Sequence, residues 1–361
     1  MAATARNVNQ TARKSLLLAF DAFGTLFTPK EPVPKQYGEV ARKYGVSVTD
    51  DEIQQSFRLA FKDEAARNPN YGKAVGMNAQ TWWANVIRAT LKPKLEERQA
   101  LPAGLIPELI NRFSSSEGYM LYPDVLPLFQ EIRNKRDGKP SAWPWERTIV
   151  GIITNSDDRV PDVLSNFGLK VGARAVGRKG QKIGEIEKDD DIEFVVLSYD
   201  VGAEKPDRRI FEAAKDMLVE TLIEERQDSD HFQAHGKPGT TTDKYNQAFE
   251  ATRNLFNGQS KDAITNNLGA SDLAGQLASE VSEFELLYVG DELKKDVLGA
   301  QNAGWPSLLL DREHKYRDSF SSGAKIASVI ESSNSDTATP RKFHVIQDLR
   351  NLSSVQISDL D

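Results

Sequence analysis

The segment Leu-Leu-Leu-Ala-Phe-Asp-Ala-Phe-Gly-Thr-Leu-Phe at residues 16–27 constrains the fold of this chain more than any other. Its apolar run ends in Asp21, and Gly24 follows where the chain is expected to turn tightly. A buried parallel strand delivers a carboxylate in this way to the carboxyl edge of a sheet, where open α/β folds bind their ligands. The segment therefore predicts an α/β fold with Asp21 at a ligand-binding edge.

Three more polar segments follow in chain order. They are Thr154-Asn155-Ser156 after apolar residues 148–153, Lys205-Pro206 in a loop, and Gly290-Asp291-Glu292-Leu293-Lys294-Lys295-Asp296 after apolar residues 285–289. Singly, each is explained as well by a helix cap, a turn or a solvated lysine. Because expected strands alternate with expected helices, we predict a doubly wound parallel sheet that brings all four segments to one edge.

The composition is that of an ordinary globular protein, with 361 residues, of which 39% are hydrophobic and 27% charged. A net charge of −7 argues against nucleic-acid binding, which favours a basic face. The absence of cysteine excludes disulfides, thiolate catalysis and cysteine-ligated zinc. No apolar run approaches the roughly 20 residues of a membrane span. We therefore expect neither a nucleic-acid nor a membrane partner, while the pattern leaves the oligomeric state open.

Hydrophobic patterning divides the chain into a core and a cap. Residues 15–28 and 121–312 are expected to form the core of the α/β fold. Residues 29–120 carry apolar side chains at helical spacing and are expected to form a helical cap inserted after the first strand.

Polar segments are expected to lie outside that core. Stretches at about 170–191 and 224–282 are predicted to be insertions, the second largely disordered apart from one short helix near residues 249–256. Residues 313–361 are predicted to be a C-terminal extension and residues 1–14 a disordered tail. Cytoplasmic or nuclear residence is expected, and a mitochondrial leader in the basic N-terminal tail is the weaker alternative.

Together the four polar segments resemble the four motifs of the haloacid dehalogenase (HAD) superfamily, most of whose members are Mg²⁺-dependent phosphatases. The resemblance covers about residues 15–310 without the two insertions, and the cap position matches the subgroup with a helical cap. Asp-Ala-Phe-Gly-Thr-Leu-Phe at 21–27 resembles the first motif of 2-haloacid dehalogenases and their eukaryotic relatives. Further segments resemble the HDHD-three-like proteins: Trp82-Trp83, Lys205-Pro206-Asp207 and Gly290-Asp291-Glu292-Leu293.

The resemblance implies hydrolysis of a small phosphorylated substrate through an aspartyl-phosphate. It gives Asp21 the role of nucleophile, which splits one difficult step into two. Thr154 and the backbone of Asn155 would donate hydrogen bonds to the phosphoryl oxygens. Lys205 would neutralise charge on the phosphate and on Asp21.

The resemblance also implies a Mg²⁺ site at the same edge. Asp21, Asp291 and Asp296 would supply carboxylate ligands, and the backbone carbonyl of Phe23 a further one. Oxygen-only ligation suits this metal, which would offset the repulsion between a carboxylate and a phosphate dianion.

Phe23 breaks the phosphatase pattern, because that superfamily places its general acid/base aspartate two residues after the nucleophile. Losing such a group costs roughly 10²- to 10⁴-fold in rate. Glu292 or Asp157 could replace it, but nothing in the sequence places either carboxyl group correctly for proton transfer. Two alternatives follow: a catalytically weak protein that binds a phosphorylated ligand or partner, and a 2-haloacid dehalogenase, which needs neither acid nor metal. The acidic pair Asp291 and Asp296 does not fit a dehalogenase. The sequence also does not identify the arginine that would bind the halide, although Arg42 lies in the expected cap.

Overall fold

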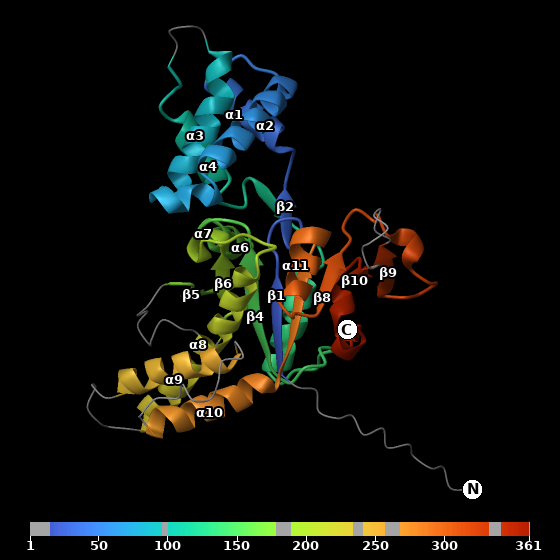
Figure 1. The fold of residues 1–361 in the computed structure, drawn as a ribbon. Coiled ribbons are helices and arrows are strands. Elements are labelled where there is room, and N and C mark those ends of the chain that lie inside the picture. Colours follow the sequence, from blue (N-terminus) through green and yellow to red (C-terminus); the bar gives the residue numbers. More distant parts are fainter. Residues whose placement is uncertain are drawn as a thin grey trace, which may run out of the picture.

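The computed structural model describes residues 15–95, 100–177, 189–233, 241–256, 268–331 and 341–360. Its main strands are β1 (Ser15–Phe20), β4 (Thr148–Thr154), β5 (Val171–Ala175), β6 (Ile192–Leu197), β7 (Phe284–Gly290), β8 (Ser307–Leu310), β9 (Ala327–Glu331) and β10 (Arg341–Ile346). They form one sheet in the order β5-β6-β4-β1-β7-β8-β10-β9 (Figure 1). All neighbours pair in parallel except β9 and β10. The predicted α/β fold with a largely parallel sheet is confirmed.

The central strand β1 is buried on both faces of the sheet. Leu16, Leu18 and Phe20 pack into the hydrophobic cluster on one face, whereas Leu17 and Ala19 pack into the cluster on the other. All five side chains are fully buried. The continuous apolar run therefore reflects a strand covered on both sides, as is usual in parallel sheets.

Helices cover the two faces. The cluster on one face includes side chains from α5 (Val125–Arg136) and α6 (Val160–Asn166), and the opposite cluster includes side chains from α8 (Arg208–Gln233), α10 (Leu268–Ser282) and α11 (Leu298–Asn302). This covering on both sides makes the sheet doubly wound. Within the described ranges, no helix has the length and apolar character needed to cross a bilayer.

The strand order reverses beside β1, because β4 lies on one side of it and β7 on the other. Open α/β sheets bind ligands outside the carboxyl ends of their strands at such a switch point. The three strands end at Phe20, Thr154 and Gly290. The fold therefore brings Thr154 to the same edge as Asp21 and Asp291, which directly follow the other two strands.

A bundle of four helices lies beyond this carboxyl edge (Figure 1). Its helices are α1 (Val33–Lys43), α2 (Asp50–Arg67), α3 (Ala79–Leu91) and α4 (Leu105–Arg112). The antiparallel pair β2 (Phe27–Pro29) and β3 (Tyr119–Leu121) connects the bundle to the large sheet. The sequence Thr-Asp-Asp-Glu starts α2 with a capping box, in which the side chains of Thr49 and Glu52 each accept the other's backbone N–H.

Residues 224–282 are not largely disordered where the structure describes them, so that prediction is wrong. Helix α8 continues to Gln233, and α9 (Thr241–Phe256) and α10 follow, at the end of the molecule opposite the cap helices (Figure 1). Their buried faces include Ala248, Ala251, Ala274 and Leu277. Alanine favours helix and lets helices approach closely, but it adds little to the apolar pattern that sequence reasoning detects.

The C-terminal segment also belongs to the core, which corrects its description as an extension. Strand β10 pairs in parallel with β8, and Phe343 and Val345 are fully buried. Part of the segment at 170–191 is ordered as well, because β5 pairs with β6. The predicted N-terminal tail, with its alternative as a leader, lies outside the described residues.

Candidate active site

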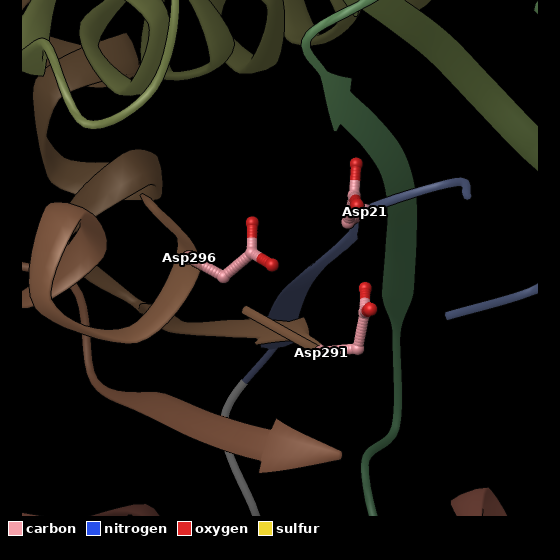
Figure 2. Close-up of side chains that lie close together, drawn as sticks. All are labelled: Asp21, Asp291 and Asp296. Atoms are coloured by element: carbon pink, nitrogen blue, oxygen red, sulfur yellow. The ribbon is translucent and has the colours of Figure 1, made fainter. Parts of the chain in front are cut away.

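Three aspartates from two segments meet at the carboxyl edge of the sheet (Figure 2). Asp21 follows β1, Asp291 follows β7, and Asp296 lies in the short helical turn Leu293–Val297. One carboxylate oxygen of each lies within 4.8 Å of the others. Asp21 is 8% exposed and Asp296 only 1%. The edge therefore concentrates negative charge where water is largely excluded.

This concentration of charge perturbs the acids. Burial raises the pKa of Asp21, and Asp296 adds to the rise, while Lys205 opposes it. Burial together with the charges of Asp21 and Asp296 raises the pKa of Asp291 to about 7, although the Thr25 hydroxyl stabilises its carboxylate with a hydrogen bond of 3.0 Å. A cation among the three carboxylates would favour their charged forms.

Two glycines make room for these carboxylates. Gly24 has a φ of +77°, and a Cβ there would come within 2.2 Å of Asp291 Oδ2. A Cβ on Gly290 would come within 2.3 Å of the Asp296 carboxyl carbon. Both positions therefore require a residue without a side chain. Gly24 also adopts the left-handed backbone conformation, which glycine takes up without steric cost.

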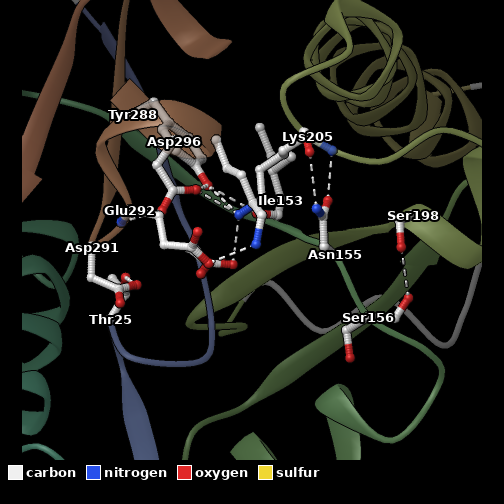
Figure 3. Close-up of polar contacts among 12 residues, drawn as sticks. Thr25, Ile153, Asn155, Ser156, Ser198, Lys205, Tyr288, Asp291, Glu292 and Asp296 are labelled. Atoms are coloured by element: carbon white, nitrogen blue, oxygen red, sulfur yellow. Dashed lines mark hydrogen bonds and ion pairs between the residues drawn. The ribbon is translucent and has the colours of Figure 1, made fainter. Parts of the chain in front are cut away.

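Lys205 supplies a positive charge to the cluster (Figure 3). Its Nζ lies 2.8 Å from Asp21 Oδ1 and 2.6 Å from Asp296 Oδ1, and it donates to the Tyr288 hydroxyl at 3.0 Å. Burial disfavours the charged ammonium, but the two carboxylates outweigh burial and raise the pKa of Lys205. Lys205 is therefore a buried cation shared by two acids.

The last residue of β4, Thr154, and the residue after it, Asn155, complete the edge. Thr154 is 1% exposed, and its hydrogen bond to Asp21 lowers the pKa of that carboxyl. The side chain of Asn155 holds the Lys205 backbone: Nδ2 donates to the Lys205 carbonyl at 3.1 Å, and Oδ1 accepts the Lys205 N–H at 2.6 Å. The sequence pointed only to the backbone of Asn155, whereas the structure shows that its side chain also holds the loop that carries Lys205.

Phe23 lies two residues from Asp21 but carries no group that could move a proton. Its ring makes edge contacts with Phe27 and Tyr119, at centroid distances of 4.6 Å and 5.6 Å. Phe23 is thus part of an aromatic cluster at the junction between the core and the cap helices.

The two carboxylates considered as substitutes for the missing acid have other partners. Asp157 is fully buried, accepts two hydrogen bonds from the Arg159 guanidinium at 2.7 and 2.8 Å, and accepts the Trp83 indole N–H at 2.9 Å. Glu292 pairs with Lys295 at 2.9 Å. The geometry offers no support for a proton-transfer role for either residue.

Sequence reasoning missed Tyr288 and Thr25. The Tyr288 hydroxyl lies 2.9 Å from Asp296 Oδ1 and 3.0 Å from the carbonyl of Ile153, which ties β7 to β4 beside the lysine. A signal existed, because a tyrosine within an apolar strand is expected to be buried with a partner for its hydroxyl. Thr25 carried no signal beyond its place in the turn after Asp21.

Comparisons with known proteins agree with this architecture. Residues 16–224 match the family model described as haloacid dehalogenase-like hydrolase. The chain is 35% identical to an uncharacterised hydrolase of Schizosaccharomyces pombe over 219 residues, 61% of this chain and 81% of that protein. It is 27% identical to an uncharacterised Saccharomyces cerevisiae protein over 309 residues, which are 86% of this chain and 76% of that protein. Mouse haloacid dehalogenase-like hydrolase domain-containing protein 3 is 28% identical over 209 residues, which are 57% of this chain and 71% of the mouse protein.

The fold and the family match together define a hydrolase with a doubly wound α/β fold. The chain belongs to the haloacid dehalogenase-like hydrolase family. The resemblance identified from the four motifs, including that to HDHD-three-like proteins, is confirmed.

Proposed function

We propose that this protein is a Mg²⁺-dependent phosphatase that acts on a small phosphorylated substrate through an aspartyl-phosphate. The observation that carries this proposal is the convergence of Asp21, Asp291 and Asp296 around the buried Lys205. Phosphoryl transfer depends on positioning and on neutralising charge, and this set provides for both.

Each side chain has a role in this reaction. Asp21 attacks phosphorus, and Lys205 offsets the charge of the attacking carboxylate and the phosphate. The Thr154 hydroxyl and the Asn155 backbone N–H donate to the phosphoryl oxygens. The Asn155 side chain keeps Lys205 in place through its two hydrogen bonds to the lysine backbone.

The donor set fits Mg²⁺. The three clustered carboxylates are hard oxygen ligands, and the raised pKa of Asp291 reflects repulsion that a divalent cation would relieve. Asp21, Asp291, Asp296 and the backbone carbonyl of Phe23 would hold the ion. When bound, it supplies charge neutralisation for the approach of a carboxylate to a phosphate.

Phe23 limits which substrates can react, because it cannot protonate a leaving group. We therefore propose slow or selective turnover, with a catalytically weak protein that binds a phosphorylated ligand or partner as the alternative. A 2-haloacid dehalogenase is less well supported: the acidic cluster is of the metal-binding type, and Arg42 pairs with Asp50 at 2.8 Å on the surface of the cap.

Phosphate release from p-nitrophenyl phosphate and acetyl phosphate, measured with Mg²⁺ or with EDTA, tests this proposal. We expect Mg²⁺-dependent release that Asp21→Asn abolishes. Unchanged release from Asp21→Asn would refute the aspartyl-phosphate route, and halide release without metal would establish the dehalogenase.

A further inference from the structure

An aromatic cavity of about 60 Å³ lies among the cap helices, and Arg159 of the core lines one side of it. Its walls include the rings of Tyr37, Phe57, Trp83, Phe113 and Tyr119. Tyr119 and Phe113 lie where the chain returns from the cap, and the other three rings come from α1, α2 and α3.

One wall of the cavity packs against Phe23, which lies near the catalytic edge. The ring of Phe23 contacts the ring of Tyr119, a wall of the cavity, at a centroid distance of 5.6 Å and an angle of 68°. Phe23 is also two residues from Asp21 in the same turn. The aromatic surface therefore extends from the cavity to the turn that carries the proposed nucleophile.

The charged group in the cavity wall is neutralised. Through its guanidinium, Arg159 makes two hydrogen bonds to Asp157, at 2.7 and 2.8 Å, and one to the Phe113 carbonyl at 3.3 Å. Its guanidinium carbon also lies 4.6 Å from the centre of the Trp83 ring. Because the charge of Arg159 is already balanced by Asp157, an uncharged aromatic group suits this lining better than a negatively charged group does.

We infer that the substrates are phosphate monoesters of phenols or similarly acidic aromatic alcohols, whose ring occupies this cavity. The inference rests on the proposed function and narrows it. Two independent features point the same way: the lining favours a ring, and the absence of an acid at Phe23 favours a leaving group that needs no proton. Phe23 is on this account a specificity residue.

The chemistry balances without a protein acid. A carboxylate oxygen of Asp21 bonds to phosphorus while the bond from phosphorus to the aryl oxygen breaks, and the electron pair leaves on the phenolate. Water then attacks the phosphorus of the aspartyl-phosphate, and the bond to Asp21 breaks. Both protons of that water end on phosphate oxygens, so dihydrogen phosphate leaves and Asp21 returns to a carboxylate.

The cavity must widen to take a ring, because an engineered cavity that binds benzene measures roughly 150 Å³. Two hydrogen bonds join cap and core at the cavity: Trp83 donates to Asp157 at 2.9 Å, and Arg159 donates to the Phe113 carbonyl at 3.3 Å. Since every aromatic wall belongs to the cap segment, the widening requires rearrangement among the cap helices and their side chains.

Steady-state kinetics of the wild-type protein test the inference with phenyl phosphate, p-nitrophenyl phosphate, acetyl phosphate and glycerol phosphate. Acetyl phosphate has a good leaving group but no ring, so it separates leaving-group chemistry from ring binding. We expect KM for both aryl esters to be at least about tenfold lower than for acetyl phosphate. Equal or lower KM for acetyl phosphate would overturn the inference while leaving the phosphatase intact. Failure of all four compounds, acetyl phosphate included, to release phosphate would refute the proposed function itself.

A filled cavity provides a second test. Ile110→Trp adds bulk to the wall, and Leu59→Trp adds the same side chain at a position that is 59% exposed and outside the cavity. We expect Ile110→Trp to raise KM for aryl esters about tenfold while kcat/KM for acetyl phosphate and all kinetics of Leu59→Trp change less than about twofold. Equal losses on aryl and acyl substrates in Ile110→Trp would contradict ring binding here.

Discussion

Lys205 Nζ lies 2.8 Å from Asp21 Oδ1, and the two side chains are 2% and 11% exposed. A buried ion pair of this kind contributes little net stability, but removing one partner leaves the other charge without compensation. The pair therefore connects the stability of the fold with the proposed chemistry.

Lys205→Met tests this connection. Because Asp21 and Asp296 would lose their shared cation, we expect the free energy of unfolding to fall by about 3 kcal/mol and phosphate release to be lost. Chemical denaturation measures the first and a phosphate assay the second. Lys295→Met is the control, since its pair with Glu292 is exposed and is worth under about 1 kcal/mol. Wild-type stability and activity in Lys205→Met would be incompatible with the account.

Phe23→Asp restores the missing acid. We expect kcat for glycerol phosphate, a poor leaving group, to rise by about 10²-fold, with a smaller gain for p-nitrophenyl phosphate. Phe23→Asn matches the aspartate in shape but moves no proton, so it should show no such gain. If the two variants gain equally, the effect comes from removing the ring and proton transfer is not the missing function.

Gly24→Ala separates backbone strain from the space that the site requires. Gly138→Ala is its match, because Gly138 has a φ of +67° and a Cβ there would meet nothing within 4 Å. We expect both variants to lose about 1 kcal/mol of stability. Calorimetric titration should show weakened Mg²⁺ binding in Gly24→Ala alone, because its Cβ would displace the Asp291 carboxylate. Equal Mg²⁺ affinity in both variants would count against Asp291 as a ligand.

The carboxyl group of Glu193 in β6, far from the active edge, is expected to make the free energy of unfolding depend on pH. Burial raises its pKa from 4.5 to about 8, although its carboxylate accepts the Val150 N–H at 2.7 Å. Since the folded pKa exceeds the unfolded value, its contribution to stability is complete below pH 4.5 and is lost as pH rises through about 8. Glu193→Gln should therefore be more stable than wild type at pH 8.5, by roughly 3 kcal/mol.

Denaturation curves at pH 5 and pH 8.5 measure this difference. Glu146→Gln, on an exposed side chain of the same region, should show no comparable change between the two pH values. A parallel pH response of Glu193→Gln and wild type would mean that Glu193 is not the titrating group.

The sequence was most informative where strands end. The apolar runs before Asp21, Thr154 and Asp291 predicted their meeting because parallel strands that are neighbours share one edge. Lys205 lies in a loop, and its role in neutralising charge followed from the resemblance and not from periodicity.

Sequence reasoning failed where contacts depend on tertiary packing. The helices of residues 241–256 and 268–282 bury alanines such as Ala248 and Ala274, which the polar average of the segment conceals. The bond from Tyr288 to Asp296 joins side chains whose partnership depends on how the turn after β7 folds back. The bracing of Lys205 by the Asn155 amide spans 50 residues and could not be read from local pattern.

The most direct test of the account is to find where the phosphoryl group is attached during turnover. The protein would be mixed with acetyl phosphate and Mg²⁺, quenched in acid, reduced with borohydride to trap acyl phosphates, and mapped by peptide mass spectrometry. We predict a single modified residue, Asp21, and none in Asp21→Asn. Phosphate release without modification of Asp21, or with modification of another residue, would contradict the proposed mechanism.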